Sequence, residues 1–114
     1  MKILLVASSS PMLEALKMIA VHLDATATLI VAEHKNAITT LLVEEPTHII
    51  YDLDEEQMTD PRFTFWKAFR QNLPANTRIV LCGFDRLSRV PEDDRSRYLQ
   101  LPIRIEEFRR ALLG

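Results

Sequence analysis

The sequence predicts an α/β fold: a doubly wound sheet of five parallel strands with helices on both faces. Short apolar runs of strand length alternate with segments in which apolar residues recur at helical spacing. Most connections between these segments span only a few residues, which is typical of strand–helix–strand units. A chain of 114 residues can bury one core of useful size, so residues 1–114 are expected to form one domain.

Three strands and two helices are predicted in the first half of the chain. The strands are residues 3–7, 28–32 and 48–52. Each is a largely apolar run, as expected for a strand buried on both faces of a sheet. Residues 11–23 are expected to form a helix with Ser10 as its N-cap and a proline at its first position. A second helix covers residues 36–45 and ends at Pro46, because proline cannot continue a helix.

The second half continues the alternation with two strands and two helices. The strands are residues 78–82 and 98–101, and the helices are residues 61–73 and 105–112. An aspartate followed by a proline at 60–61 marks the start of the first of these helices, and Gly114 closes the second. Residues 84–97 are polar and contain a proline, so we expect only a short or irregular helix there.

Charge is distributed unevenly along the chain. The formal net charge of −2 argues against a nucleic-acid footprint over the whole domain. Residues 1–61 contain three Lys and ten acidic residues, whereas residues 62–114 contain eleven basic residues, ten of them Arg, and six acidic ones. We interpret the two halves as ordinary solvated helix faces or, as the alternative, as an acidic pocket followed by an Arg-rich partner surface.

Ligands of parallel α/β sheets bind at the carboxyl ends of the strands. The residues of interest at those ends are Ala7, Ser8, Asp52, Asp54, Cys82 and Leu101. No glycine-rich phosphate loop follows any predicted strand, which disfavours a nucleotide-binding function. His22, His34 and His48 fall on different predicted elements, so no histidine metal site is expected.

At these strand ends the sequence resembles the receiver domain of two-component response regulators, and the resemblance covers the whole chain. Residues 46–52 are similar to the family's run of proline, apolar strand and phospho-accepting aspartate, which places the acceptor at Asp52. Ser8 lies 44 positions before Asp52 and Cys82 lies 30 positions after it, as the family's acidic pair, acceptor and switch hydroxyl require. Residues 98–103 look like the closing motif of tyrosine, leucine, any residue, lysine, proline and phenylalanine. The resemblance implies a flavodoxin-like sheet with strand order 2-1-3-4-5 and a role in bacterial two-component or phosphorelay signalling.

Several positions depart from the family's pattern. Where the family has two metal-binding acids, this chain has Ala7 and Ser8. Cys82 stands in place of the family's switch hydroxyl, and Leu101 stands in place of its lysine. Phosphoryl transfer depends on charge neutralisation by Mg²⁺ and a cation, and Mg²⁺ prefers carboxylate and water oxygens. We therefore expect a degenerate receiver that is not phosphorylated on Asp52, binds no metal or cofactor and is not an enzyme. Asp52 is then expected to be a solvated strand-end carboxylate, and Cys82 a small buried apolar residue.

Two alternatives remain open at this point. In the first, the chain is an active receiver in which Asp54 or Glu55 joins Asp52 as a substitute Mg²⁺ ligand. In the second, the Arg-rich half binds nucleic acid or another anionic partner, with an affinity that falls steeply as salt is added. The arginines that would serve this second function are Arg86, Arg89, Arg95, Arg97, Arg104, Arg109 and Arg110.

The expected partner is another signalling protein, an output domain of the same protein or a second copy of the domain. We place the interaction surface on the fifth strand and the last helix, where aromatic and guanidinium side chains typical of interface hot spots occur together. Its residues are Tyr98, Glu106, Arg109 and Arg110. The lone Cys82 and the absence of a long apolar run favour a cytoplasmic location without membrane contact.

Overall fold

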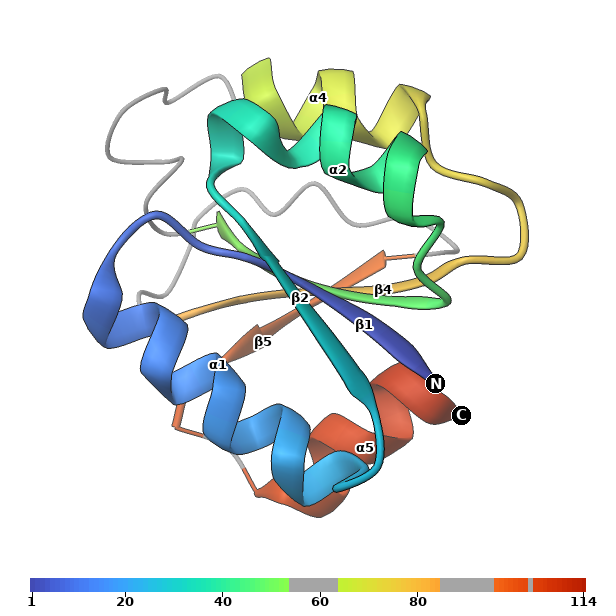
Figure 1. Ribbon diagram of the computed structural model, residues 1–114. Helices are drawn as coiled ribbons and strands as arrows, with labels where there is room; N and C mark the ends of the chain where they lie inside the picture. Colours follow the sequence, from blue (N-terminus) through green and yellow to red (C-terminus); the bar gives the residue numbers. More distant parts are fainter. Residues whose placement is uncertain (54–63, 85–95, 103) are drawn as a thin grey trace.

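A five-stranded parallel sheet forms the centre of the computed structural model, which describes residues 1–53, 64–84, 96–102 and 104–114 (Figure 1). The strands are β1 (Lys2–Val6), β2 (Thr28–Ala32), β3 (His48–Asp52), β4 (Arg78–Gly83) and β5 (Ser96–Gln100). Their order is β2-β1-β3-β4-β5, and every neighbouring pair is parallel. The predicted fold class and strand order are confirmed.

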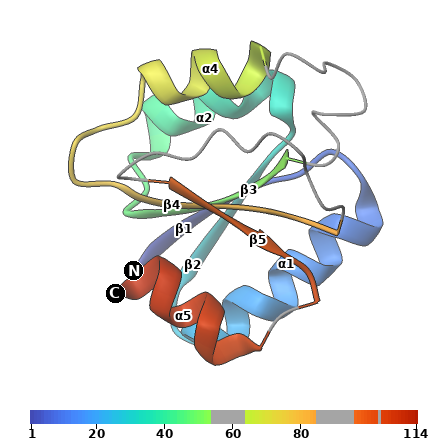
Figure 2. The same cartoon turned by 180° about the vertical axis from the view of Figure 1, so that it is seen from behind.

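Helices cover both faces of this sheet. Helices α1 (Ser10–Leu23) and α5 (Ile105–Leu113) lie on one face, as Figures 1 and 2 show. On the other face lie α2 (Ala37–Glu44), which follows a short 3₁₀ helix η1 (His34–Asn36), and α4 (Thr64–Gln71). Within the described ranges, every helix is too short or too polar to cross a lipid bilayer.

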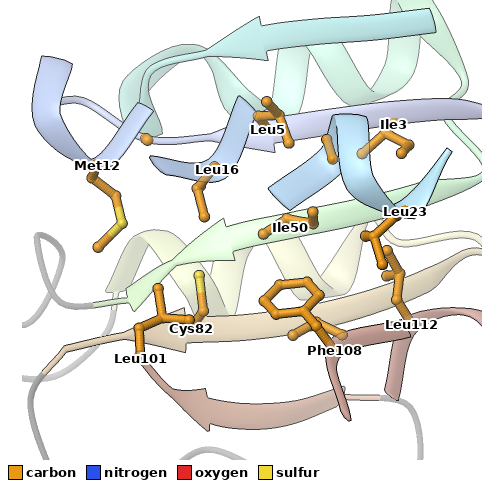
Figure 3. Close-up of a cluster of buried hydrophobic side chains, with 13 residues drawn as sticks. Ile3, Leu5, Met12, Leu16, Leu23, Ile50, Cys82, Leu101, Phe108 and Leu112 are labelled. Atoms are coloured by element: carbon orange, nitrogen blue, oxygen red, sulfur yellow. The ribbon is translucent and has the colours of Figure 1, made fainter. Parts of the chain in front are cut away.

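The two faces of the sheet bury separate apolar clusters, because successive side chains of a strand point to opposite sides. Ile3 and Leu5 of β1 pack with residues of α1 and α5, among them Leu16 and Phe108 (Figure 3). The intervening residues of β1 pack on the other face. There they meet Tyr51 of β3 and the aromatic side chains Trp66 and Phe69 of α4. A strand residue therefore belongs to the α1/α5 side or to the α2/α4 side according to its position.

Local signals explain where α1 and α2 begin and end, with one correction. The N-cap of α1 is Ser9 rather than Ser10, since Ser9 Oγ accepts a hydrogen bond from Met12 N at 3.4 Å. Glu45 follows α2 with a left-handed φ of 49°, a conformation that ends the helix directly before Pro46.

Other boundaries differ from the sequence prediction by a few residues. Strand β1 ends at Val6, which leaves Ala7 just beyond it, and α4 ends at Gln71 rather than at residue 73. Strand β5 covers Ser96–Gln100 instead of 98–101. Its first two residues are polar and so gave no strand signal in the sequence, yet they pair with β4. Most of the irregular helix expected over 84–97 lies outside the described residues, as does the predicted helix start at 60–61.

Candidate functional site

The carboxyl ends of the five strands meet at one edge of the sheet, and the residues expected to form a site lie there. Ala7 and Ser8 follow β1, Asp52 ends β3, and Cys82 is paired with Asp52 in the register of β3 and β4. Leu101 follows β5, and its backbone N–H donates to Gly83 O at 2.6 Å. Asp54 and Glu55 lie outside the described residues.

Asp52 is fully buried, with an exposed fraction of 0%, and its Oδ2 atom is inaccessible to solvent. The expectation of a solvated carboxylate is therefore wrong. The reason is topological: β3 is the central strand of the sheet, and the alternation that places Ile50 on the α1/α5 side places Asp52 there too. The end of a central strand is covered by its neighbours. The sequence shows that a strand ends at Asp52, but it does not show that this strand is the central one.

A histidine that the sequence analysis assigned no role connects Ser8 to Asp52. His34 begins the short η1 helix, is separated from β2 by Glu33 alone, and is 8% exposed. Its Nδ1 atom lies 2.7 Å from Ser8 Oγ, and its Nε2 atom lies 2.6 Å from the backbone oxygen of Asp52. The backbone N–H of His34 also donates to Ser8 Oγ at 3.2 Å. The imidazole thus connects the ends of β1, β2 and β3.

These contacts identify the protonation of the neutral ring. A carbonyl oxygen only accepts hydrogen bonds, so Nε2 of His34 carries the hydrogen that points to Asp52 O. Nδ1 is then the acceptor of the neutral imidazole, and the Ser8 hydroxyl donates to it. The ring also packs edge-on against Tyr51, with centroids 5.2 Å apart and an interplanar angle of 85°. His34 is therefore held in one orientation by its packing against Tyr51, by the hydrogen bond that Nε2 donates and by the one that Nδ1 accepts.

The other strand-end positions are apolar in their surroundings. Cys82 is 0% exposed, as predicted for a small buried residue, and its thiol donates to Tyr51 O at 3.6 Å. Leu101 is buried in the cluster on the α1/α5 side (Figure 3). Ala7 belongs to the same cluster. Two of the positions at which the resembled family has charged groups are thus part of the hydrophobic core.

The donors described at this edge do not suit a divalent cation. Ala7 has no donor side chain, the Ser8 hydroxyl is bound to His34, and Asp52 supplies the carboxylate. Within the described ranges, no three His, Cys, Asp or Glu side chains come together in a way that would hold a metal ion. Mg²⁺ requires hard oxygen ligands in near-octahedral geometry, and this set does not provide them.

A second candidate site is a groove of about 380 Å³ between β5 and α5. Its lining residues are Arg97, Leu99, Arg104, Glu106, Glu107, Arg110 and Ala111. Glu106 and Arg110 of the predicted interaction surface belong to it. Among the described residues, no ion pair involves any of the five charged side chains of the groove.

Two residues of the predicted interaction surface lie away from this groove. Tyr98 pairs with Leu81 and packs on the α2/α4 side, whereas Leu99 packs on the α1/α5 side. The expected position of the tyrosine ring beside the guanidinium groups is corrected accordingly. Arg109 donates to the backbone oxygen of His22 at 2.7 Å and so contacts the end of α1.

Comparisons with known proteins agree with this architecture. No protein-family model and no curated protein matches the sequence. Among solved structures, the chain is similar to the N-terminal domain of the nisin resistance regulator NsrR, a lantibiotic response regulator. That match has a TM-score of 0.61 and 17% identity, and it covers 94% of this chain and 90% of that one. The chain is also similar to a CheY-like response regulator from Mesorhizobium loti, with a TM-score of 0.62, 15% identity and coverage of 96% and 93%. The chain therefore has the fold of a CheY-like receiver domain.

Proposed function

We propose that this domain is a receiver-like signalling module that works without phosphorylation and acts by binding another protein. The observation that carries the proposal is the hydrogen-bonded connection from Ser8 through His34 to the Asp52 backbone. It occupies the strand ends at which the resembled family binds its metal ion. Fold similarity to response regulators supports the signalling role, and a single buried cysteine is in keeping with the cytoplasmic location that we propose.

The chemistry of phosphoryl transfer supports the first half of this proposal. Transfer to a carboxylate needs positive charge around the phosphoryl oxygens, because there is little covalent work for the protein to do. Leu101 is buried where the family has its lysine, and Ala7 and Ser8 replace the acids that hold the metal. A fully buried Asp52 also has no direct exposure to a phosphodonor in solution.

The groove between β5 and α5 supports the second half. Arg97, Arg104 and Arg110 line it together with two glutamates. Because both signs of charge are present, the groove suits a mixed-charge protein surface better than a polyanion such as nucleic acid. This chemistry suits a partner protein, an output domain of the same protein or a second copy of the chain. In a two-fold dimer, the same patch of each copy would pair with that of the other.

A phosphodonor experiment tests the proposal. The purified domain is incubated with a small acyl phosphate in the presence of Mg²⁺, and intact mass and peptide mapping are measured. We expect no adduct on Asp52, and the Asp52→Asn variant serves as the matched control. A stoichiometric adduct that maps to Asp52 and is absent from the variant would establish the alternative, an active receiver with Asp54 or Glu55 as a substitute ligand.

A further inference from the structure

We propose that Ser8 is an activated nucleophile and a site of covalent acylation, with His34 as its general base. The donor would be an acyl group on a good leaving group, that is, an activated ester or a thioester. This proposal shares the contact between Ser8 and His34 with the proposed independence from phosphorylation, but it does not involve the groove between β5 and α5, so it and protein binding can fail separately.

The geometry is that of a nucleophile, a base and a third group that orients the base. Ser8 Oγ lies 2.7 Å from His34 Nδ1, within the range over which a proton is transferred directly. The opposite ring nitrogen is anchored 2.6 Å from Asp52 O, so the basic nitrogen is aimed at the hydroxyl. A backbone oxygen here performs the orienting task that a carboxylate performs in the Ser-His-Asp arrangement.

Ser8 and His34 differ in solvent exposure, as a nucleophile and its general base should. Ser8 is exposed, whereas His34 is 8% exposed and Asp52 is fully buried. A donor can therefore reach the hydroxyl while the base remains shielded from water and fixed in orientation. Ser8 also precedes the N-cap Ser9 of the 14-residue helix α1, and the positive end of the helix dipole favours negative charge at this point.

The reaction can be written with atoms and electrons balanced. Ser8 Oγ forms a bond to the carbonyl carbon of the donor as its proton passes to His34 Nδ1, which gives a tetrahedral intermediate and an imidazolium. The bond between that carbon and the leaving oxygen or sulfur then breaks, and the leaving group takes the proton back from His34. The products are an ester on Ser8, a free alcohol or thiol, and His34 in its original neutral form. No oxidant, reductant or metal ion is needed.

Acyl transfer suits this site better than phosphoryl transfer. A neutral ester develops a single negative oxygen in its tetrahedral intermediate, whereas a phosphoryl group brings several charged oxygens that require cations. The hydrogen bond between Ser8 and His34 provides the base that acyl transfer needs, and Leu101 is buried where the resembled family has the lysine that neutralises a phosphoryl group.

The test uses p-nitrophenyl acetate as the acyl donor and the intact chain as the protein. Release of nitrophenolate is followed by absorbance, and intact mass and peptide mapping locate the acetyl group. We expect one acetyl group on Ser8, none at that position in Ser8→Ala, and a rate in His34→Gln reduced by roughly 100-fold, the usual contribution of a general base. Ser10→Ala is the matched control, because Ser10 is an exposed serine nearby without a histidine contact in the described structure, and it should react at the unchanged rate.

Two outcomes would overturn the proposal. One is acetylation confined to lysines or the N-terminus, and the other is a folded His34→Gln variant that acetylates Ser8 as fast as the wild type. Circular dichroism shows whether this variant is folded. If it is not, the wild type alone decides the matter by peptide mapping: Ser8 must be acetylated at least roughly 100-fold faster than Ser10, and equal rates at the two serines reject an activated Ser8.

Discussion

At the scale of single residues, the central observation is that His34 organises the strand ends around Asp52. The imidazole makes hydrogen bonds with Ser8 Oγ and with the Asp52 backbone oxygen, and its ring packs against Tyr51. Since this ring is nearly buried, both its packing and its hydrogen bonds contribute to stability. Because Asp52 is buried, Asp52→Asn is a substitution inside the protein and not at its surface.

We predict that His34→Ala lowers the free energy of unfolding by about 2–3 kcal/mol. The change removes the donor to a buried carbonyl, which costs about 1–3 kcal/mol, and leaves a cavity beside Tyr51. The matched control is His22→Ala, since the His22 ring bonds to Met18 O on the exposed surface of α1 and should change stability by less than about 0.5 kcal/mol. Urea denaturation measures both, and equal effects would contradict the prediction.

His48 gives a prediction for the pH dependence of stability. Burial, followed by the charges of Arg78 and the N-terminus, lowers the pKa of His48 from its usual value of 6.5. The unfolded chain therefore binds this proton more tightly than the folded chain, so His48 contributes stability above pH 6.5 that is lost as the pH falls through its folded pKa. In urea denaturation at several pH values, His48→Gln should lose less stability on acidification below pH 6.5 than the wild type. An identical slope in the two proteins would count against this assignment.

At the scale of elements, two neighbouring arginines of helix α5 contact different parts of the molecule. Arg109 reaches across to the carboxyl end of α1, where its guanidinium donates to His22 O at 2.7 Å. A cation at that end of a helix satisfies a terminal carbonyl and complements the helix dipole. Arg110, the next residue, lines the groove beside β5. Sequence periodicity places both on the polar surface of the helix, but only the positions of α1 and β5 separate their roles.

This separation predicts opposite results for two adjacent substitutions. Arg109→Ala should lower the free energy of unfolding by about 0.5–1.5 kcal/mol, because a hydrogen bond that joins two helices is lost. Arg110→Ala should leave stability within about 0.5 kcal/mol of the wild type, as is usual for surface changes. Thermal denaturation compares them directly, and a larger loss for the Arg110 variant would show that the contact with α1 is not what stabilises the junction.

At the scale of the whole molecule, the sheet separates residues that the sequence places side by side. Tyr98 and Leu99 are consecutive, yet one packs on the α2/α4 side and the other on the α1/α5 side. The groove is therefore an arginine and glutamate surface without the tyrosine ring. Mixed-charge surfaces of this kind give binding that depends on the position of each charge and on ionic strength.

We predict that Arg110→Glu weakens partner binding, or self-association of the isolated domain, by tenfold or more. The change reverses a charge in the groove next to Glu106 and Glu107, so the surface loses its complementarity. Lys67→Glu is the matched control, because it makes the same change in net charge on an exposed residue of α4, away from the groove. Analytical ultracentrifugation and pull-down from the host measure the effect, and an equal loss for both variants would show that net charge rather than the groove decides association.

The sequence by itself determined the fold class, the five strands, the end of a helix before Pro46 and the strand order implied by its resemblance to receivers, and the structure agrees. Periodicity, capping residues and prolines act over a few positions, so they can be interpreted locally. His34 is a different case. It is the second residue after β2, so the rule that sites lie at strand ends points to it, but its partners lie 26 and 18 positions away in the chain.

The tertiary structure decided what these residues meet. Asp52 is buried because β3 takes the central place in the sheet, and Tyr98 turns away from the arginines because side chains of a strand alternate between faces. His34 reaches Ser8 and Asp52 because β1 lies between β2 and β3, which brings three strand ends within the reach of one imidazole. Local sequence specifies each element, whereas burial and hydrogen-bond partners are properties of the packed sheet.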